Sequence, residues 1–136
     1  KMVEDAAIKA LYQPENDTYV IGEETIKDFS PEQLETAIQG TSYILDPIDG
    51  TVPYSCSIPV WGVSLGFAKA GKLLEGCIVL PATHEVMITN NGKTYYAKGA
   101  SALPDFEQLT EVCPSVKENC QHPSRVFVIS QLAVKR

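Results

Sequence analysis

Apolar residues near the start of the chain recur every three or four positions, which is the spacing of one face of a helix. The residues that follow this spacing are Val3, Ala6, Ala7, Ile8 and Leu11. Pro14, with Asn16 and Asp17 behind it, predicts where this segment closes. The pattern therefore predicts a first helix whose apolar face packs on the core.

A second helix is predicted from the residues that would begin and end it. Ser30 can cap the helix, Pro31 suits the first helical position, and Gln33 completes a capping box. The helix is predicted to run to Gln39 and to stop at Gly40.

Two short apolar runs in the first third of the chain predict strands that lead into acidic residues. Residues 19–21 form an extended run, which Glu23-Glu24 follows after one glycine. Residues 42–45 predict the next strand, and this strand delivers Asp46 to its carboxyl end before Pro47 prevents further regular pairing. Strand ends are common positions for functional groups.

The middle of the chain predicts two antiparallel hairpins. Residues 60–68 and 73–80 flank one short turn, and residues 85–89 and 94–97 flank a turn around Asn91-Gly92, the strongest short hairpin signal. Helices followed by such strands predict an α+β fold, with layered helices on an antiparallel sheet. A doubly wound parallel sheet would need helices between its strands, and none is predicted after residue 60.

The last part of the chain has a weaker pattern. Residues 99–124 are rich in Pro, Ser and polar residues and predict a long loop, with one helical turn around residues 106–109. Residues 125–130 predict a final strand that continues toward Arg136 without a stop signal. Because Lys1 already lies within the helical pattern, both ends look interrupted, and we expect the chain to be part of a longer protein.

Composition narrows the class of protein. The 136 residues carry a net charge of −6, with 44% hydrophobic and 21% charged residues, which is typical of one globular domain. The acidity is local, because residues 1–49 hold eleven Asp and Glu against three Lys. The chain has no basic stripe for a nucleic acid polymer and no apolar run of the roughly 18–20 residues that a membrane span needs.

The spacing of the cysteines indicates the cellular compartment of the protein. The four cysteines have no C-x-x-C spacing, so the default expectation is reduced thiols in a cytoplasmic protein, with a Cys113–Cys120 bridge as the alternative.

Two acidic elements are the candidates for a functional site. Glu23-Glu24 follows one strand, and Asp46 and Asp49 flank a Pro-Ile turn after the next. Each alone is also typical of a polar turn or a solvated loop. Two acid pairs at strand ends repel each other unless a cation offsets the charge, so together they favour a site for Mg²⁺ or Mn²⁺. A short helix that begins near Thr51 would add free N–H groups for a phosphate oxygen.

These elements resemble the inositol monophosphatase family, within the lithium-sensitive, Mg²⁺-dependent phosphatase superfamily. The family's G-E-E-[ST] element stands here as Gly22-Glu23-Glu24-Thr25, and its D-P-[IL]-D-G-T element as Asp46-Pro47-Ile48-Asp49-Gly50-Thr51. The two elements keep the family's order and a similar separation. The resemblance continues through residues 60–68, Leu74-Glu75-Gly76 and residues 96–99, so it covers about residues 1–100.

The resemblance implies roles for individual residues. Glu23, Asp46, Asp49 and the carbonyl of Ile48 would ligate the metal ions, with Glu24 in a supporting position. Thr51, assisted by Glu23, would orient a water, while Asp49 and the amides of Gly50 and Thr51 would contact the substrate phosphate. Cations at such a site neutralise the phosphate and activate water, so a covalent phosphoenzyme is not needed.

The chain also departs from the family pattern. The Trp-Asp pair of the family's second half is absent, and an Asp that often pairs with the signature Thr would fall just before Lys1. Val52-Pro53-Tyr54 stands where inositol monophosphatases usually have an Asn and an aromatic residue and bisphosphate nucleotidases a Lys. The substrate class therefore stays open between a small phosphorylated polyol or sugar and a 3′(2′),5′-bisphosphate nucleotide.

The resemblance implies an organisation for the whole protein. Residues 1–130 would be an N-terminal metal-binding α+β domain without its beginning, and residues 131–136 would start the connection to a C-terminal α/β domain. The parent would be a lithium-sensitive cytoplasmic homodimer acting on a small phosphorylated substrate, while this piece alone would be inactive. The alternative is a noncatalytic metal-binding or interaction fragment, and uncovered sheet surface should make the isolated piece sticky or dimeric.

Overall fold

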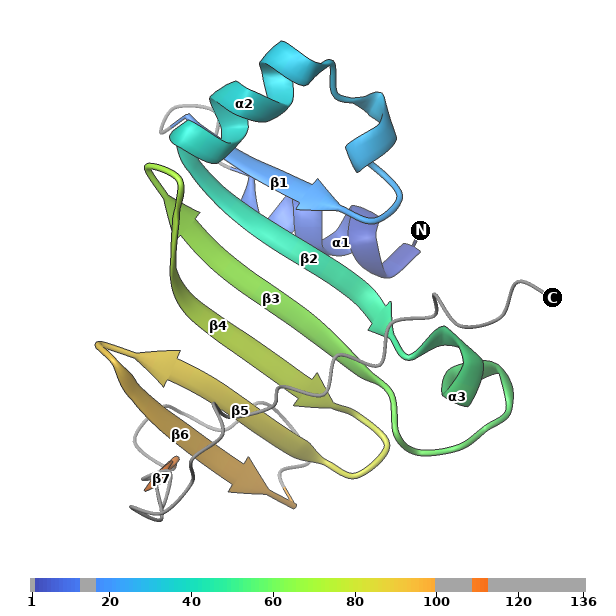
Figure 1. The fold of residues 1–136 in the computed structure, drawn as a ribbon. Coiled ribbons are helices and arrows are strands. Elements are labelled where there is room, and N and C mark those ends of the chain that lie inside the picture. Colours follow the sequence, from blue (N-terminus) through green and yellow to red (C-terminus); the bar gives the residue numbers. More distant parts are fainter. Residues whose placement is uncertain (1, 13–16, 100–108, 113–136) are drawn as a thin grey trace, which may run out of the picture.

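The computed structural model describes residues 2–12, 17–99 and 109–112. Within these residues, seven strands lie side by side in chain order (Figure 1). The strands are β1 (Thr18–Gly22), β2 (Thr41–Asp49), β3 (Gly62–Lys69), β4 (Lys72–Leu80), β5 (Glu85–Asn90), β6 (Lys93–Lys98) and β7 (Thr110–Val112). The helices are α1 (Met2–Leu11), the 3₁₀ helix η2 (Ile26–Asp28), α2 (Pro31–Gln39) and α3 (Thr51–Ser55).

The α+β class is confirmed, but the sheet is mixed rather than antiparallel. β1 pairs in parallel with β2, with Ile21 opposite Ile44 and Gly22 opposite Leu45, whereas every later pair is antiparallel. The reason is local. α2 lies between β1 and β2 in the chain and carries the chain back to the start of β1, so that β2 runs in the same direction as β1. The helix at α2 was predicted, but the parallel pairing of the strands on either side of it was not.

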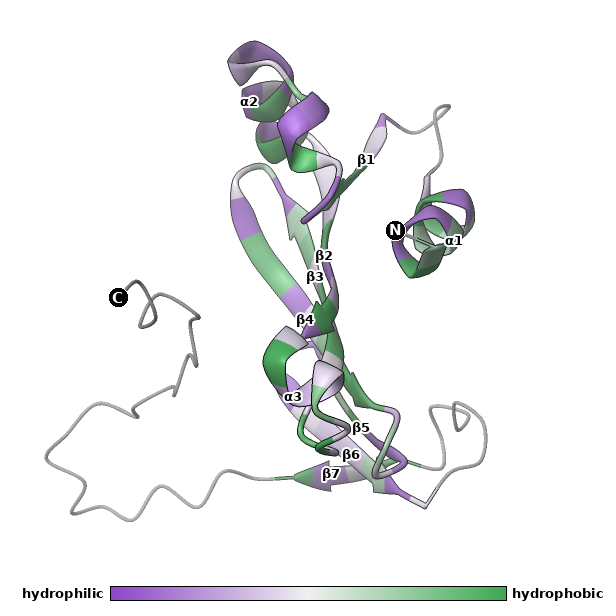
Figure 2. Ribbon diagram, turned by 90° about the vertical axis from the view of Figure 1, so that its right-hand side faces the viewer, coloured by the Kyte–Doolittle hydropathy of each residue, from purple (hydrophilic) through white to green (hydrophobic). Residues whose placement is uncertain are grey.

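The two longer helices lie on opposite faces of the sheet at its β1–β3 end (Figure 2). α1 contacts β1 and β2, and α2 contacts β2 and β3. The buried apolar residues gather mainly at this end; they are Val20, Ile21, Ala37, Leu45 and Ala68, with Val86 on β5. No helix among the described residues is long and apolar enough to cross a membrane.

The predicted local signals are confirmed at the second helix and the two hairpins. Ser30 Oγ accepts the Gln33 N–H at 3.2 Å, and Gln33 Oε1 accepts the Ser30 N–H at 2.9 Å, which is a complete capping box. At the β5–β6 turn, Asn91 and Gly92 have φ values of 51° and 75°, as a type I′ hairpin requires. Lys69 pairs with Lys72 across the β3–β4 turn.

Two strand boundaries differ from the prediction. β2 continues past Pro47 to Asp49, because the register shifts between Asp46 and Asp49. Pro47 has no N–H to donate, and this bulge leaves it outside the regular strand pairing. β7 lies within the predicted loop at residues 99–124 and pairs with β6. The helical turn around residues 106–109, the strand at 125–130 and the Cys113–Cys120 alternative fall wholly or mostly outside the described residues.

The face of the sheet opposite α1 carries exposed apolar side chains. Leu73 is 69% exposed, and Ile44, Ile78 and Met87 are between 44% and 47% exposed. These residues line one shallow cavity of about 580 Å³. Exposed, contiguous apolar surface of this kind favours association.

We expect the 136-residue chain to self-associate through this face. Leu73→Thr should weaken the association about fivefold or more, since it removes much of the exposed apolar surface of one side chain. Val60→Thr is the matched control, because Val60 is 65% exposed but lies outside the cavity lining. Light scattering over a concentration series measures the effect, and a stable monomer at every concentration would contradict the expectation.

Candidate functional site

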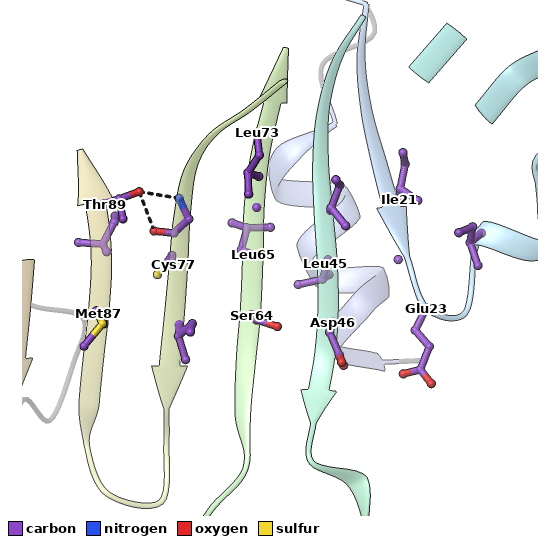
Figure 3. Close-up of a pocket in the computed structure, with 17 residues that line it drawn as sticks. Ile21, Glu23, Leu45, Asp46, Ser64, Leu65, Leu73, Cys77, Met87 and Thr89 are labelled. Atoms are coloured by element: carbon purple, nitrogen blue, oxygen red, sulfur yellow. Dashed lines mark hydrogen bonds between the residues drawn. The ribbon is translucent and has the colours of Figure 1, made fainter. Parts of the chain in front are cut away.

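The two acidic elements meet at one edge of the sheet. Because β1 and β2 are parallel and Gly22 lies opposite Leu45, Glu23 directly after β1 lies beside Asp46, which is inside β2 just before its bulge. Both line the cavity of about 580 Å³, and their carboxylates extend toward the same edge (Figure 3). The pairing thus brings together one acid from each predicted element.

The Gly22–Thr25 turn is held by hydrogen bonds on two sides. The Gly22 N–H donates to Thr25 Oγ1 at 3.0 Å, which closes the turn on itself. From α1, Glu4 accepts the N–H of Glu24 at 3.2 Å and the N–H of Thr25 at 3.0 Å. The turn therefore has a fixed backbone, although the side chain of Glu23 is exposed.

Gly22 is required here for space rather than for an unusual backbone angle. A Cβ at Gly22 would overlap the Glu4 carboxylate, with Glu4 Cδ only 2.5 Å away. Real Cβ atoms do not approach other heavy atoms so closely. Gly22 therefore lets the Glu4 carboxylate of α1 reach the backbone of the Gly22–Thr25 turn.

Glu4 is the residue that the sequence analysis missed. It is 1% exposed, whereas Lys, Glu, Arg and Asp are almost never fully buried unless they are paired. A signal was available, since Glu4 shares the helical spacing of Ile8 and Leu11, four and seven positions later. An acidic residue in the row of a helix that faces the core needs a partner there.

The Asp46–Gly50 segment is an ordered bulge rather than a free turn. Asp46 Oδ1 accepts the Ile48 N–H at 3.1 Å, which bridges the buried Pro47. Gly50 has a φ of 93°, and a Cβ there would lie 3.2 Å from the Val60 carbonyl oxygen. The expected helix start at Thr51 is confirmed, because Gly50 caps α3 and Thr51 is its first residue.

Thr51 and Asp49 lie beyond this bulge. The Thr51 hydroxyl donates to the Ile48 carbonyl oxygen at 3.3 Å, so it lies beside one of the predicted metal ligands. Asp49 is exposed and pairs with Gly62, outside the cavity lining. Tyr54 of α3 contacts Trp61, which lies between α3 and β3, edge to face with ring centroids 4.9 Å apart.

The chemistry of these donors suits a hard divalent cation, and the structure brings part of the set together. Glu23, Asp46, Asp49 and the Ile48 carbonyl offer only oxygen atoms, as Mg²⁺ prefers. Of the three carboxylates, Glu23 and Asp46 share the cavity, and Asp49 does not. Among the described residues, no three acidic, His or Cys side chains form a group that could hold a metal ion.

Glu24 and Cys77 have other surroundings. The Glu24 carboxylate forms an exposed ion pair with Lys27 at 3.3 Å, three residues on, so its side chain is engaged at the surface. Cys77 lines the cavity, where burial raises the pKa of its thiol. At neutral pH Cys77 is therefore an un-ionised thiol rather than a reactive thiolate.

Comparison with known proteins gives a family match for this chain. The model of the inositol monophosphatase family matches residues 1–131. An inositol monophosphatase from Dictyostelium discoideum is 27% identical over 112 residues, covering 82% of this chain and 40% of that protein. A fructose-1,6-bisphosphatase/inositol-1-monophosphatase from Thermotoga maritima is 27% identical over 94 residues, covering 65% and 37%.

A solved structure shares the fold. SuhB from Mycobacterium tuberculosis superposes with a TM-score of 0.52 at 25% identity, covering 68% of this chain and 33% of that one. The chain thus spans 40% or less of the length of each of these three proteins.

Gly22→Ala should lower the free energy of unfolding by about 1–3 kcal/mol, because the added methyl group overlaps the buried Glu4 carboxylate. Gly76→Ala is the matched control on another strand, since a Cβ there would meet only the Leu65 carbonyl oxygen, at 3.8 Å. Urea unfolding measures both variants. Equal losses in the two would contradict close contact with Glu4 as the cause.

Iodoacetamide should modify Cys77 several times more slowly than Cys56 at pH 8. Cys56 is exposed, whereas burial raises the pKa of the Cys77 thiol and so reduces its thiolate fraction. Because the thiolate fraction of Cys77 rises with pH, the ratio of the two rates should shrink at higher pH. Mass-spectrometric peptide mapping of a time course separates the cysteines, and equal rates would show that Cys77 is not shielded.

Proposed function

The chain belongs to the inositol monophosphatase family, and on that premise we propose that its acidic sheet edge is the metal and phosphate site of a phosphomonoesterase. The names of the family and of its relatives indicate a phosphatase, that is, a hydrolase of phosphate esters. The observation that carries the proposal is the parallel pairing of β1 with β2, which places Glu23 and Asp46 at one edge of the cavity.

The proposed ligands of the cation are the carboxylates of Glu23, Asp46 and Asp49 and the carbonyl oxygen of Ile48. Mg²⁺ is the proposed cofactor, with Mn²⁺ as a substitute, since both prefer carboxylate and carbonyl oxygen. When bound, such a cation offsets the charge of the phosphate and makes water a better nucleophile. The high charge density suits phosphate monoester hydrolysis, which is among the slowest uncatalysed reactions.

The remaining roles fall to the start of α3. Thr51, whose hydroxyl lies 3.3 Å from the Ile48 carbonyl oxygen, is proposed to orient the attacking water together with Glu23. Asp49 and the amides of Gly50 and Thr51 are proposed to contact the phosphate. The left-handed Gly50 supports this assignment, because it turns the chain directly into α3 without a side chain at the cap.

The proposed substrate is a small phosphorylated polyol or sugar. The Thermotoga maritima relative, named for a sugar bisphosphate and an inositol phosphate, supports this class. A 3′(2′),5′-bisphosphate nucleotide is the alternative, because Val52-Pro53-Tyr54 matches neither pattern. A noncatalytic role for this chain alone is a further alternative, favoured because Asp49 does not line the cavity that Glu23 and Asp46 share.

The proposal for the whole protein has further parts that rest on the family resemblance and the composition. They are a domain over residues 1–130 that leads into a C-terminal α/β domain, a homodimer, lithium sensitivity and a cytoplasmic location. Because this chain spans 40% or less of the relatives above, we propose that it binds the cation by itself but needs the rest of the protein for turnover.

Asp49→Asn should weaken Mg²⁺ binding by the 136-residue chain at least about tenfold, since it removes one charged ligand while an exposed side chain has little effect on folding. Asp28→Asn is the matched control, with the same change on an exposed Asp outside the site. Calorimetric titration measures binding, and release of inorganic phosphate from polyol, sugar and bisphosphate nucleotide substrates measures turnover. Equal Mg²⁺ affinity in Asp49→Asn and wild type would contradict the ligand assignment.

A further inference from the structure

Glu4 is a buried carboxylate to which the proposed reaction gives no role. It is 1% exposed on α1, and both of its oxygens accept hydrogen bonds from backbone N–H groups of the Gly22–Thr25 turn. A buried carboxylate costs much free energy unless such bonds compensate for lost hydration. Bonds to a charged acceptor are also the stronger kind, so this contact defines where the turn lies.

The contacts of Glu4 fall on both sides of Glu23. Before Glu23, the carboxylate lies against the backbone of Gly22, where no side chain would fit. After Glu23, it accepts the N–H of Glu24 at 3.2 Å and the N–H of Thr25 at 3.0 Å. The backbone around Glu23 is therefore fastened to α1, on one face of the sheet.

Two of the proposed ligands, Glu23 and Asp46, lie on the side of the sheet away from α1. Figure 3 shows α1 behind the sheet, with the carboxylates of Glu23 and Asp46 at the edge in front of it. Because the N–H groups of Glu24 and Thr25 point toward Glu4 of α1, the Glu23 side chain leaves the turn on the other side, where Asp46 lies. The direction of the Glu23 carboxylate thus depends on a contact made behind it.

We propose that Glu4 is a positioning residue, which holds the Gly22–Thr25 turn so that the Glu23 carboxylate extends to the same edge of the cavity as the Asp46 carboxylate, where both can contact a cation. This inference rests on the proposed role of Glu23 as a ligand. Residues that orient metal ligands through hydrogen bonds have large effects on metal affinity without touching the metal. An apolar side chain would fill the same space but would leave both N–H groups without their acceptor.

The test compares Glu4→Gln and Glu4→Met with wild type and with Asp5→Asn. Asp5 is the matched control, because it is the exposed acidic neighbour of Glu4 on the same helix. Gln offers one acceptor oxygen in place of two, and Met preserves length and volume without an acceptor. Calorimetric titration with Mg²⁺ gives the affinity, and urea unfolding identifies variants that keep the wild-type fold.

Amide hydrogen exchange supplies a readout that needs neither metal nor activity. In wild type without Mg²⁺, we expect the amides of Glu24 and Thr25 to exchange slowly for a turn, because both donate to Glu4. In Glu4→Gln and Glu4→Met these two amides should exchange faster, and Mg²⁺ affinity should fall about tenfold or more. Asp5→Asn should match wild type in both measurements.

The outcomes separate this inference from the proposed function. If Glu23→Gln loses Mg²⁺ affinity while folded Glu4→Gln and Glu4→Met keep it, the positioning role is wrong and the metal site stands. If wild type does not bind Mg²⁺, the proposed function fails and the positioning role fails with it. Wild-type amides of Glu24 and Thr25 that exchange as fast as free turns would overturn the inference even if no Glu4 variant folds.

Discussion

Parallel strands end at the same edge of a sheet, and the candidate site depends on this constraint. β1 and β2 are the parallel pair among the described strands; Glu23 directly follows β1, whereas β2 contains Asp46 and ends at Asp49. Had β2 paired with β1 in the antiparallel sense, Glu23 and Asp46 would lie at opposite edges. α2 makes the parallel pairing possible, since it carries the chain back to the end of the sheet where β1 begins before β2 starts.

Gathering carboxylates at one edge has an electrostatic cost, and the surrounding structure deals with each acid differently. Asp46 accepts an N–H from its own bulge, and the Glu24 side chain pairs with Lys27 at the surface. Glu4 is buried and accepts two N–H groups from the turn. The side chains of Glu23 and Asp49 are exposed. Glu4 thus helps to hold the turn in place, whereas Asp46, which also accepts a backbone N–H, and the exposed Glu23 and Asp49 are the proposed ligands.

Much of the fold followed from local signals, because those signals act over a few residues. The Ser30 capping box, the Asn91-Gly92 turn and the helical spacing from Val3 to Leu11 each specify their element without help from distant residues. Pro47 misled the prediction of β2, since a bulge allowed the strand to continue to Asp49. β7 was missed because its three residues, all exposed, carry no alternating pattern that would distinguish them from a loop.

By itself, the sequence determined which groups this protein offers: two acidic elements, the glycines Gly22 and Gly50 within them, and a family resemblance that these elements carry. The tertiary structure alone decided which of these groups meet. Strand direction and the burial of Glu4 depend on contacts between residues about 20 positions apart, and no periodic pattern in a single segment encodes them. That Asp49 does not line the cavity shared by Glu23 and Asp46 is also a property of the folded chain, and Asp49 follows the register shift in the β2–β3 pairing.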